Sequence, residues 1–444
     1  MVAFHSIYKK AYYPLVFFGA LYVTAVYLAT YPAVNRALLY MNWLNPTYFQ
    51  DVNDVEKFGF LSHQVQPFNL HTPDNETLYA WHILPAHLAH KHETLLKQTG
   101  TWGPAPDFTA TGAFKILADD PNARVVVNLH GNAVHIASGW RPATYTSFLA
   151  ASTPSHPVHV IAFDYRGFGL STGSPTEDGL ITDAETVIRY LTSGPLKIPR
   201  ERIAVVGHSL GTAVAAGVVE RMTLGQGDAD TQKHEGSKEL ANPAFAGVVL
   251  FAGFSDLESL IETYSLFGIF PPFLSPLIQY PRAQRYVLRK LADKWPTAER
   301  MGRLTGALPL PSSSSSSPAD ASVELPPLHL QILHAKNDAE IWWGNGFRIF
   351  STATNVTAVD EKHDEMKVVE GTKEGFGTVV RDERSGDGKV RSIVWEKAGV
   401  KGAARQRKTR VRWERVRYGG HNGITAHQIA TMAIVRVFEG EEGI

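Results

Sequence analysis

The sequence predicts an α/β fold: a mostly parallel, doubly wound sheet with a helical cap insertion, preceded by one N-terminal transmembrane helix. Three observations support this prediction. Short β-branched apolar runs alternate with helical stretches, a long apolar segment separates two of these runs, and the first 36 residues contain an uncharged apolar stretch. The chain has 444 residues, of which 44% are hydrophobic and 19% charged, enough for one large domain with a sizeable core.

Charge and cysteine content exclude several classes of function. Lys+Arg and Asp+Glu both number 43, so no net field attracts nucleic acid. The chain has no cysteine, which excludes disulfides, thiolate catalysis and cysteine-ligated metal sites. We expect no cofactor, no metal, no nucleic-acid partner and no obligatory protein partner.

The N-terminal segment, residues 1–36, predicts a tail and a membrane anchor with a helix at about 11–31. No residue from Ala11 to Asn35 carries a formal charge, and about 20 helical residues cross a bilayer core. A cleaved signal peptide is the alternative, but its apolar part usually has only about 7–15 residues. The amphipathic rings near the two ends also favour an anchor, and they belong to Tyr12, Tyr13, Tyr27 and Tyr31.

The flanking charges predict the orientation of this anchor. Lys9 and Lys10 precede the apolar stretch and only Arg36 follows it closely, which favours a cytosolic N-terminus. We therefore expect a single-pass protein of the endoplasmic reticulum membrane with a lumenal catalytic domain. Asn75-Glu76-Thr77 and Asn355-Val356-Thr357 would then be glycosylation acceptors.

The main domain is predicted over residues 50–444. Its buried strands are short and nearly unbroken apolar runs, as in a parallel sheet covered on both faces. An early strand is expected at Leu78–Leu84, and the others at Arg124–Leu129, His159–Phe163, Ile203–Val206, Gly247–Phe251, Leu328–Leu333 and Trp413–Tyr418. Helices are expected at Trp140–Ala151, Gly179–Thr192 and Leu210–Met222.

Three segments interrupt this alternation. Residues 254–304 are rich in Leu, Phe, Pro and Tyr and are too long for an ordinary connection, which predicts a helical cap. Residues 309–318 include six consecutive serines and predict a flexible loop. Residues 360–410 are charged, with a hairpin turn expected at 386–388, and are interpreted as a surface insertion. Its basic end, Lys401 to Arg417, is interpreted as a solvated face rather than a lipid contact.

The pattern Gly-x-Ser-x-Gly occurs twice, around Ser209 and around Ser171. A nucleophilic serine of this type needs a sharp turn from a strand into a helix. Ser209 follows the strand Ile203–Val206 and precedes a run of small residues suited to a helix against the sheet. Ser171 lies in a glycine-rich loop with no helix directly after it. Ser209 is therefore the predicted nucleophile, and Ser171 is interpreted as a turn residue.

The serine needs a base, and the base needs an orienting acid. Asp338 follows the strand Leu328–Leu333 and is the predicted acid, with Glu340 and Asp256 as alternatives. His421 lies in a glycine-rich loop after the last strand and is the predicted base.

An acyl-transfer site also needs donors for an oxyanion. The backbone N–H groups of Leu210 and Asn132 are the candidates, and Gly131 permits the tight turn beside Asn132. His130 in the same loop is interpreted as structural rather than as a base.

With these motifs placed, the chain resembles the α/β-hydrolases. Within them it looks like the branch of abhydrolase domain-containing protein 12, membrane-anchored lysophospholipases and monoacylglycerol lipases. The resemblance implies catalytic Ser209, Asp338 and His421 and a lipid-ester substrate. Two departures, Val134-His135-Ile136 and Asn337, leave the substrate open. The resemblance covers roughly Leu78 to the C-terminus and is carried by His130-Gly131-Asn132-Ala133, Asp164-Tyr165-Arg166-Gly167, Gly207-His208-Ser209-Leu210-Gly211, His334-Ala335 and Asp338.

The expected function is hydrolysis of carboxylic esters of acyl lipids, a lysophospholipid or monoacylglycerol, through an acyl-enzyme on Ser209. A thioesterase, an amidase or a small-ester carboxylesterase would use the same triad. A non-catalytic binding protein of the same fold is the alternative from a different class.

Overall fold

The computed structural model describes residues 2–225, 244–265, 272–310, 325–360, 366–369, 376–398 and 408–440. Except for its first two residues, the predicted polyserine loop lies outside these ranges. So do residues 266–271 of the predicted cap and residues 401–407 of the basic end of the charged insertion.

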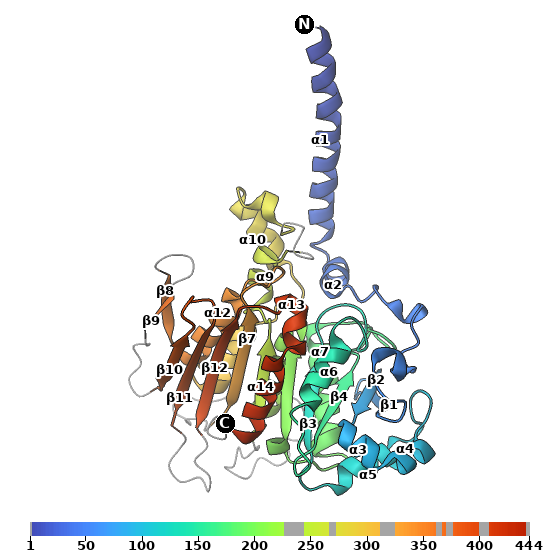
Figure 1. The fold of residues 1–444 in the computed structure, drawn as a ribbon. Coiled ribbons are helices and arrows are strands. Elements are labelled where there is room, and N and C mark those ends of the chain that lie inside the picture. The colour runs from blue at the N-terminus through green and yellow to red at the C-terminus, as the bar shows by residue number, and fades with distance from the viewer. Residues whose placement is uncertain are drawn as a thin grey trace, which may run out of the picture.

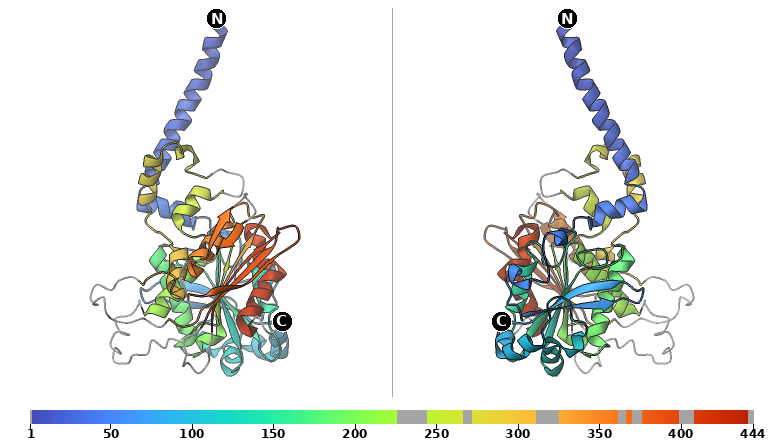
Figure 2. Two further views of the ribbon diagram at one scale, coloured as in Figure 1. Left: turned by 90° about the vertical axis from the view of Figure 1, so that its left-hand side faces the viewer. Right: turned by 90° about the vertical axis from the view of Figure 1, so that its right-hand side faces the viewer.

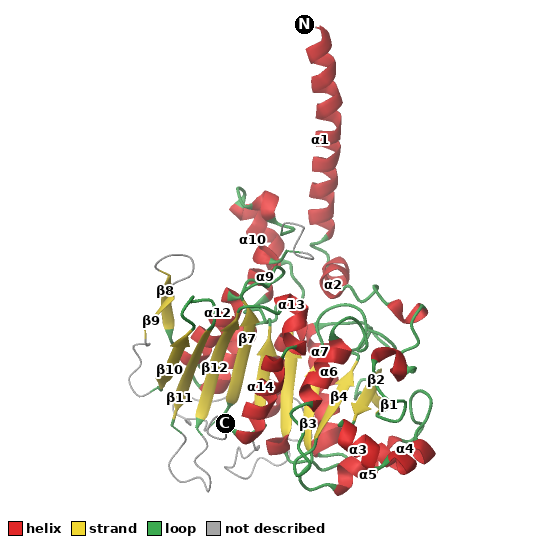
Figure 3. Ribbon diagram, in the orientation of Figure 1, coloured by secondary structure: helices red, strands yellow, loops and turns green. Residues whose placement is uncertain are grey.

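Ten strands form one sheet in the order β1-β2-β4-β3-β5-β6-β7-β12-β11-β10 (Figures 1 and 3). The six strands from β4 to β12 in this order pair in parallel, and the two pairs at the edges are antiparallel. The predicted mostly parallel, doubly wound sheet is confirmed. The strands are β1 (Val65–His71), β2 (Thr77–Ile83), β3 (Arg124–Leu129), β4 (Val158–Phe163), β5 (Ile203–His208), β6 (Gly247–Phe251), β7 (His329–Ala335), β10 (Thr378–Arg384), β11 (Arg391–Lys397) and β12 (Thr409–Val416), and a separate pair is formed by β8 (Thr357–Asp360) and β9 (Met366–Val369).

Helices cover both faces of the sheet, and alternate residues of its strands enter two cores. Val125 and Val127 of β3 belong to the core that includes residues of α7, α8, α11 and α12, whereas Val126 belongs to the core that includes residues of α6 and α14. The helices are α1 (Val2–Leu28), α2 (Pro32–Tyr40), α3 (Ala86–Lys91), α4 (Glu93–Thr99), α5 (Gly112–Asp119), α6 (Arg141–Leu149), α7 (Glu177–Thr192), α8 (Leu210–Leu224), α9 (Leu257–Thr263), α10 (Pro281–Arg289), α11 (Thr297–Thr305), α12 (Gly344–Thr354), α13 (Gly420–Gly423) and α14 (Gln428–Glu439).

The charged insertion is more than a surface feature. Its hairpin turn lies where expected, with Gly388 at φ 67°, but the two strands beside it, β10 and β11, extend the main sheet. Trp395 of β11 is fully buried. The sequence did not predict this strand because of its charged residues, one of which, Arg391, is buried and forms a 2.7 Å ion pair with Asp382 of β10.

Helix α1 projects away from the domain (Figures 1 and 2). Its apolar side chains are exposed, including Leu15 (73%), Phe17 (65%) and Val23 (65%). Within the described residues no single helix is both long enough and apolar enough to cross a membrane. Tyr12–Leu28 and Pro32–Tyr40 meet that requirement only together, as a pair bent by 101°.

Helix α2 belongs to the domain, which therefore begins before the expected residue 50. Tyr40 is fully buried, and its hydroxyl donates to Asp293, 2.9 Å away. Arg36 forms an ion pair with the same carboxylate. The structure also divides the predicted cap. Helices α9 and α10 stand above the sheet (Figure 1), whereas α11 packs into the main core through Met301 and Leu304.

Candidate active site

Ser209 lies on a sharp turn between β5 and α8. Its backbone has φ 51° and ψ −118°, a strained conformation for a residue with a side chain. A hydrogen bond of 3.0 Å from the Ser209 amide to the carbonyl of Phe251 holds this turn. A Cβ atom on Gly207 or Gly211 would overlap neighbouring backbone, so the two glycines of the motif are required by close packing.

Ser209, His421 and Asp338 form one chain of hydrogen bonds. Nε2 of His421 lies 3.0 Å from Oγ of Ser209, and Nδ1 of His421 lies 2.9 Å from Oδ2 of Asp338. Since the carboxylate accepts, Nδ1 carries a proton and Nε2 is free to accept the serine proton. Gly419 and Gly420, with φ 133° and 57°, form the turn that brings His421 over Ser209.

Four donors surround the Asp338 carboxylate. Oδ2 accepts from His421 and from Nε2 of His334 (3.1 Å), and Oδ1 accepts from the amides of Glu340 and Ile341 (2.9 Å each). Burial by itself would raise the pKa of Asp338, but the two histidines outweigh it and hold the pKa well below its usual range. Burial likewise works to lower the pKa of His421, yet Asp338 raises it above the ordinary value. Asp338 is therefore ionised and stabilises a protonated His421.

The two alternative acids have other partners. Asp256 caps α9 by accepting from the amide of Ser259, 2.7 Å away. Glu340 accepts from the hydroxyl of Tyr264 at 3.3 Å. Of the three candidates, the structure brings only Asp338 into hydrogen-bonding contact with His421.

The two predicted oxyanion donors lie beside the serine. Leu210 is the first residue of α8, and the loop of Asn132 approaches so closely that a Cβ on Gly131 would lie 3.3 Å from Cβ of Ser209. Within the described residues neither the Leu210 amide nor the Asn132 amide has a hydrogen-bond acceptor. Both N–H groups are thus available to an anionic oxygen formed at Ser209.

Comparison with known proteins identifies the family of the chain. The model of the alpha/beta hydrolase family matches residues 125–357, more than half of the chain. The chain belongs to the α/β-hydrolase family.

Named relatives lie within this family. The chain is 31% identical over 209 residues to lysophosphatidylserine lipase ABHD12 of Xenopus tropicalis, covering 47% of this chain and 48% of that protein. It is 32% identical over 166 residues to protein ABHD12B of Homo sapiens, covering 37% and 39% of the two chains. The chain thus spans about half the length of the curated relatives it matches. A solved α/β-hydrolase from Vibrio vulnificus aligns with a TM-score of 0.43 and 13% identity, covering 72% of this chain and 80% of that chain.

Sequence reasoning missed one residue that shapes this hydrolase site. The Arg141 guanidinium donates through Nη2 to the carbonyls of Gly131 (2.8 Å), Asn132 (3.0 Å) and Ala133 (3.0 Å). Three successive carbonyls of the loop that carries Asn132 therefore bind one cation. The loop needs this support, because Ala133 and Val134 both have positive φ, 58° and 52°.

Two histidines of the α/β-hydrolase motifs also act as supports. His334 donates to Asp338, as described above. His208 donates from Nε2 to the backbone carbonyl of His421 at 2.9 Å, and burial lowers the pKa of His208 to about 3, so its ring is neutral. His130 is fully buried against Tyr165 and does not contact Ser209, in agreement with its predicted structural role.

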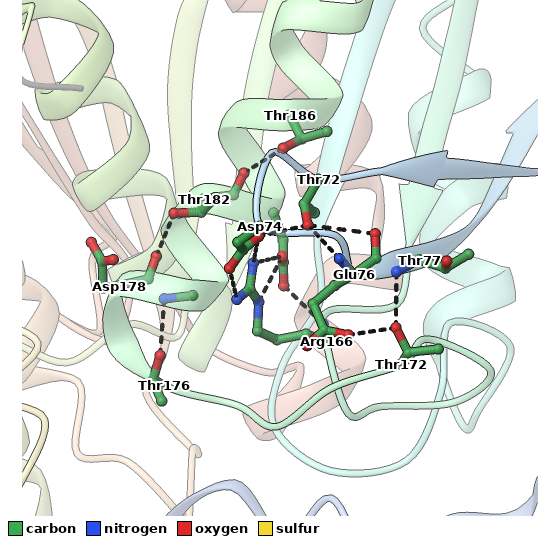
Figure 4. A network of polar contacts seen from close by, with 12 residues as sticks. Thr72, Asp74, Glu76, Thr77, Arg166, Thr172, Thr176, Asp178, Thr182 and Thr186 are labelled. Atoms are coloured by element: carbon green, nitrogen blue, oxygen red, sulfur yellow. Dashed lines mark hydrogen bonds and ion pairs between the residues drawn. The ribbon is translucent and has the colours of Figure 1, made fainter. Parts of the chain in front are cut away.

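The second Gly-x-Ser-x-Gly match is part of a structural network, and Figure 4 shows Thr172 of this motif bonded to Glu76. The Ser171 hydroxyl donates to the carbonyl of Asp164 (2.7 Å) and accepts from the amide of Tyr79 (2.9 Å). Arg166, from the Asp-Tyr-Arg-Gly element, pairs with Asp183 of α7 at 2.8 Å and with Asp74 of the β1–β2 turn. This element therefore joins the first hairpin to the body of the hydrolase fold.

A cavity of about 220 Å³ lies beside β1 and α4, and its lining includes His63, Gln66, Lys97 and Trp102. None of Ser209, Asp338 and His421 lines it.

Proposed function

We propose that this chain is a membrane-anchored serine hydrolase that cleaves carboxylic esters of acyl lipids. The observation that carries the proposal is the unbroken chain of hydrogen bonds from Ser209 through His421 to Asp338. The strained backbone of Ser209 and the two unpaired amides of Leu210 and Asn132 lie at the same place as this chain of hydrogen bonds. A binding protein of the same fold would not need these features together.

The proposed reaction begins at Ser209. Its Oγ attacks the ester carbonyl while Nε2 of His421 takes the hydroxyl proton. The carbonyl oxygen becomes an anion, which the amides of Leu210 and Asn132 stabilise. Asp338 stabilises the imidazolium. His421 then gives its proton to the leaving alcohol, and an acyl group remains on Ser209.

Water completes the cycle. His421 removes a proton from the water as it attacks the acyl-serine. When the second tetrahedral intermediate collapses, His421 returns a proton to Oγ of Ser209, and the fatty acid leaves. A thioester or an amide would pass through the same acyl-enzyme. The triad therefore supports the reaction type, and the choice of substrate needs other support.

Two features support an acyl-lipid substrate. The relatives include proteins named lysophosphatidylserine lipase, which favours a lysophospholipid over a small water-soluble ester. The site also lies on the side of the sheet from which α1 projects, below α9 and α10 (Figure 1). An anchor at this end would hold the site near a bilayer, where acyl lipids are concentrated. Lysophospholipid and monoacylglycerol are the two substrate classes proposed.

The anchor is proposed to be α1, in a single-pass protein of the endoplasmic reticulum with a lumenal domain. The support is the exposure of Leu15, Phe17 and Val23 on a helix that projects away from the domain (Figure 1). The lysines before the apolar stretch support the orientation.

The proposed function is tested with a fluorophosphonate probe and a chain-length series. Ser209→Ala should abolish covalent labelling, since Oγ of Ser209 is the attacking atom. In the wild-type chain kcat/KM should rise with acyl length along a series of monoacylglycerols or lysophospholipids. Each additional buried methylene should contribute up to about 0.8 kcal/mol of binding free energy.

The matched control is Ser171→Ala, which alters the other motif and should retain most of the labelling. Loss of labelling in folded Ser171→Ala protein would contradict the assignment of the nucleophile. A kcat/KM that is highest for acetate or butyrate esters would contradict the lipid substrate and leave a small-ester hydrolase.

A further inference from the structure

The part of the cap that stands above the sheet contacts α1. The Tyr22 hydroxyl donates to the backbone carbonyl of Phe273 at 3.1 Å, and the two rings lie 5.9 Å apart. Val26 of α1 packs against a small separate core formed by Leu274, Val287 and Leu288. Residues 272–290, named here the cap tip, therefore have a fixed position beside the helix (Figures 1 and 2).

This contact sets the height of the cap tip on the proposed anchor. Tyr22 precedes Leu28, the last residue of α1, by six positions. At about 1.5 Å per residue, the contact lies roughly 9 Å up the helix from its end. Helix α1 has 27 residues and is about 40 Å long, which matches a bilayer together with its headgroup layers. If α1 spans the bilayer in this way, its last turn lies among the headgroups and the Tyr22 contact lies near the boundary between headgroups and acyl chains.

The exposed surface of the cap tip has the composition of an interfacial membrane segment. Its apolar and aromatic side chains are exposed, with Ile278 at 62%, Tyr280 at 65% and Tyr286 at 56%. Four basic side chains are exposed beside them, those of Arg282, Arg285, Arg289 and Lys290. Within the described part of the chain no carboxylate forms an ion pair with any of the four. Helices with aromatic and basic side chains together bind anionic bilayer surfaces.

We propose that the cap tip lies in the headgroup layer of the leaflet next to the domain, with its rings in the boundary region and its cations on lipid phosphates or carboxylates. This inference rests on the proposed membrane anchor, and it adds a second membrane contact.

The absence of cysteine from the chain makes a direct test possible. Full-length Ile278→Cys protein, labelled with an environment-sensitive fluorophore, is placed in nanodiscs containing a lipid-borne nitroxide near the headgroups. Phe17→Cys reports on the anchor, and Trp102→Cys, exposed on the far side of the domain, serves as the control. We expect the label at position 278 to be quenched several-fold more than the label at position 102.

Two other outcomes would contradict different parts of the proposal. Quenching at position 17 with no more quenching at 278 than at 102 would overturn the cap-tip contact and leave the anchor standing. Quenching at neither 17 nor 278 would contradict the anchor itself. Fluorophosphonate labelling of Ser209 in the same samples reports on the hydrolase independently of both.

A second experiment tests the charge. In nanodiscs with phosphatidylserine, quenching at position 278 should exceed that in pure phosphatidylcholine, since each cation near an anionic surface favours contact about fivefold. Arg282→Glu combined with Arg285→Glu and Arg289→Glu should remove the difference. The matched control reverses three exposed lysines far from the cap, Lys91, Lys115 and Lys197, and should retain it. Equal quenching with and without phosphatidylserine would overturn the preference for anionic lipid.

Discussion

At the scale of single residues, the environment of Asp338 decides how the proposed base behaves. Its four donors keep it ionised and fix the proton of His421 on Nδ1. His421 is buried, and burial opposes protonation, so the raised pKa of His421 depends on the charge of Asp338. The activity should therefore depend on pH in a way that changes when this carboxylate is removed.

Asp338→Asn should lower kcat by about 10⁴-fold and also move the acid limb of the pH profile. The base acts when neutral, so kcat/KM of the wild-type enzyme falls as pH drops through the raised pKa of His421. Without the negative charge, burial lowers that pKa and the limb shifts to lower pH. The measurement is kcat/KM of a soluble ester against pH. Glu340→Gln is the control and should shift the limb less, since Glu340 contributes less to the pKa of His421. An unmoved limb in Asp338→Asn would mean that another group titrates.

The sequence predicts those site residues that lie next to a recognisable strand or turn. Ser209, Asp338 and His421 follow strands in a fixed chain order, so their proximity follows from the topology of a parallel sheet. Arg141 could not be found in this way. Its contacts depend on a loop in which Ala133 and Val134 take positive φ, a conformation that neither residue type favours.

At the scale of elements, α2 connects the proposed anchor to the site. Nδ2 of Asn132 in the oxyanion loop donates to the carbonyl of Leu39, at 2.5 Å. Side chains farther along the chain support the neighbouring loop, because Asn42 donates to the carbonyl of Gly167 and Asn45 to that of Gly169. The sequence placed the domain start at residue 50, because α2 resembles a continuation of the apolar anchor and its partners are distant in the chain.

Truncation should separate the proposed role of α1 as an anchor from the role of α2 in the fold of the domain. A chain that starts at Thr30 keeps Tyr40 and its bond to Asp293, and should unfold at nearly the same temperature as the full-length protein. A chain that starts at Tyr48 loses this buried ring and should be destabilised by about 3–5 kcal/mol, as for other buried aromatic deletions. Thermal unfolding and fluorophosphonate labelling of both chains give the comparison. Equal stability of the two would contradict the assignment of α2 to the domain.

At the scale of the whole molecule, the sheet was predictable in its centre and not at its edge. Strands β3 to β7 are apolar runs buried on both faces, which is a strong signal in one sequence. Strands β10 and β11 carry many charges, and Arg391 becomes buried only after pairing with Asp382 of the neighbouring strand. Such a strand can be recognised only when its partner is known.

The orientation of the molecule has its own test. Asn75 lies exposed in the β1–β2 turn, and Asn355 lies exposed at the end of α12. If the domain is lumenal, full-length protein made in a eukaryotic host should gain glycan at one or both positions. Glycosidase treatment should then shift its mobility, and Asn75→Gln with Asn355→Gln should remove the shift. Digestion of the domain by protease added to intact microsomes would contradict the lumenal orientation.

Asp293 ties α2, the cap and the body to one carboxylate, since it accepts from Arg36, from Tyr40 and from the amide of Glu177. Together with the bond from Tyr22 of α1 to the cap, these bonds limit rotation of the domain on the proposed anchor. A site held at one orientation to a bilayer encounters substrate by lateral diffusion within that bilayer. Its rate is then set by the mole fraction of substrate in the surface, so that diluting the substrate with inert lipid slows the reaction even when the total amount in the sample is unchanged.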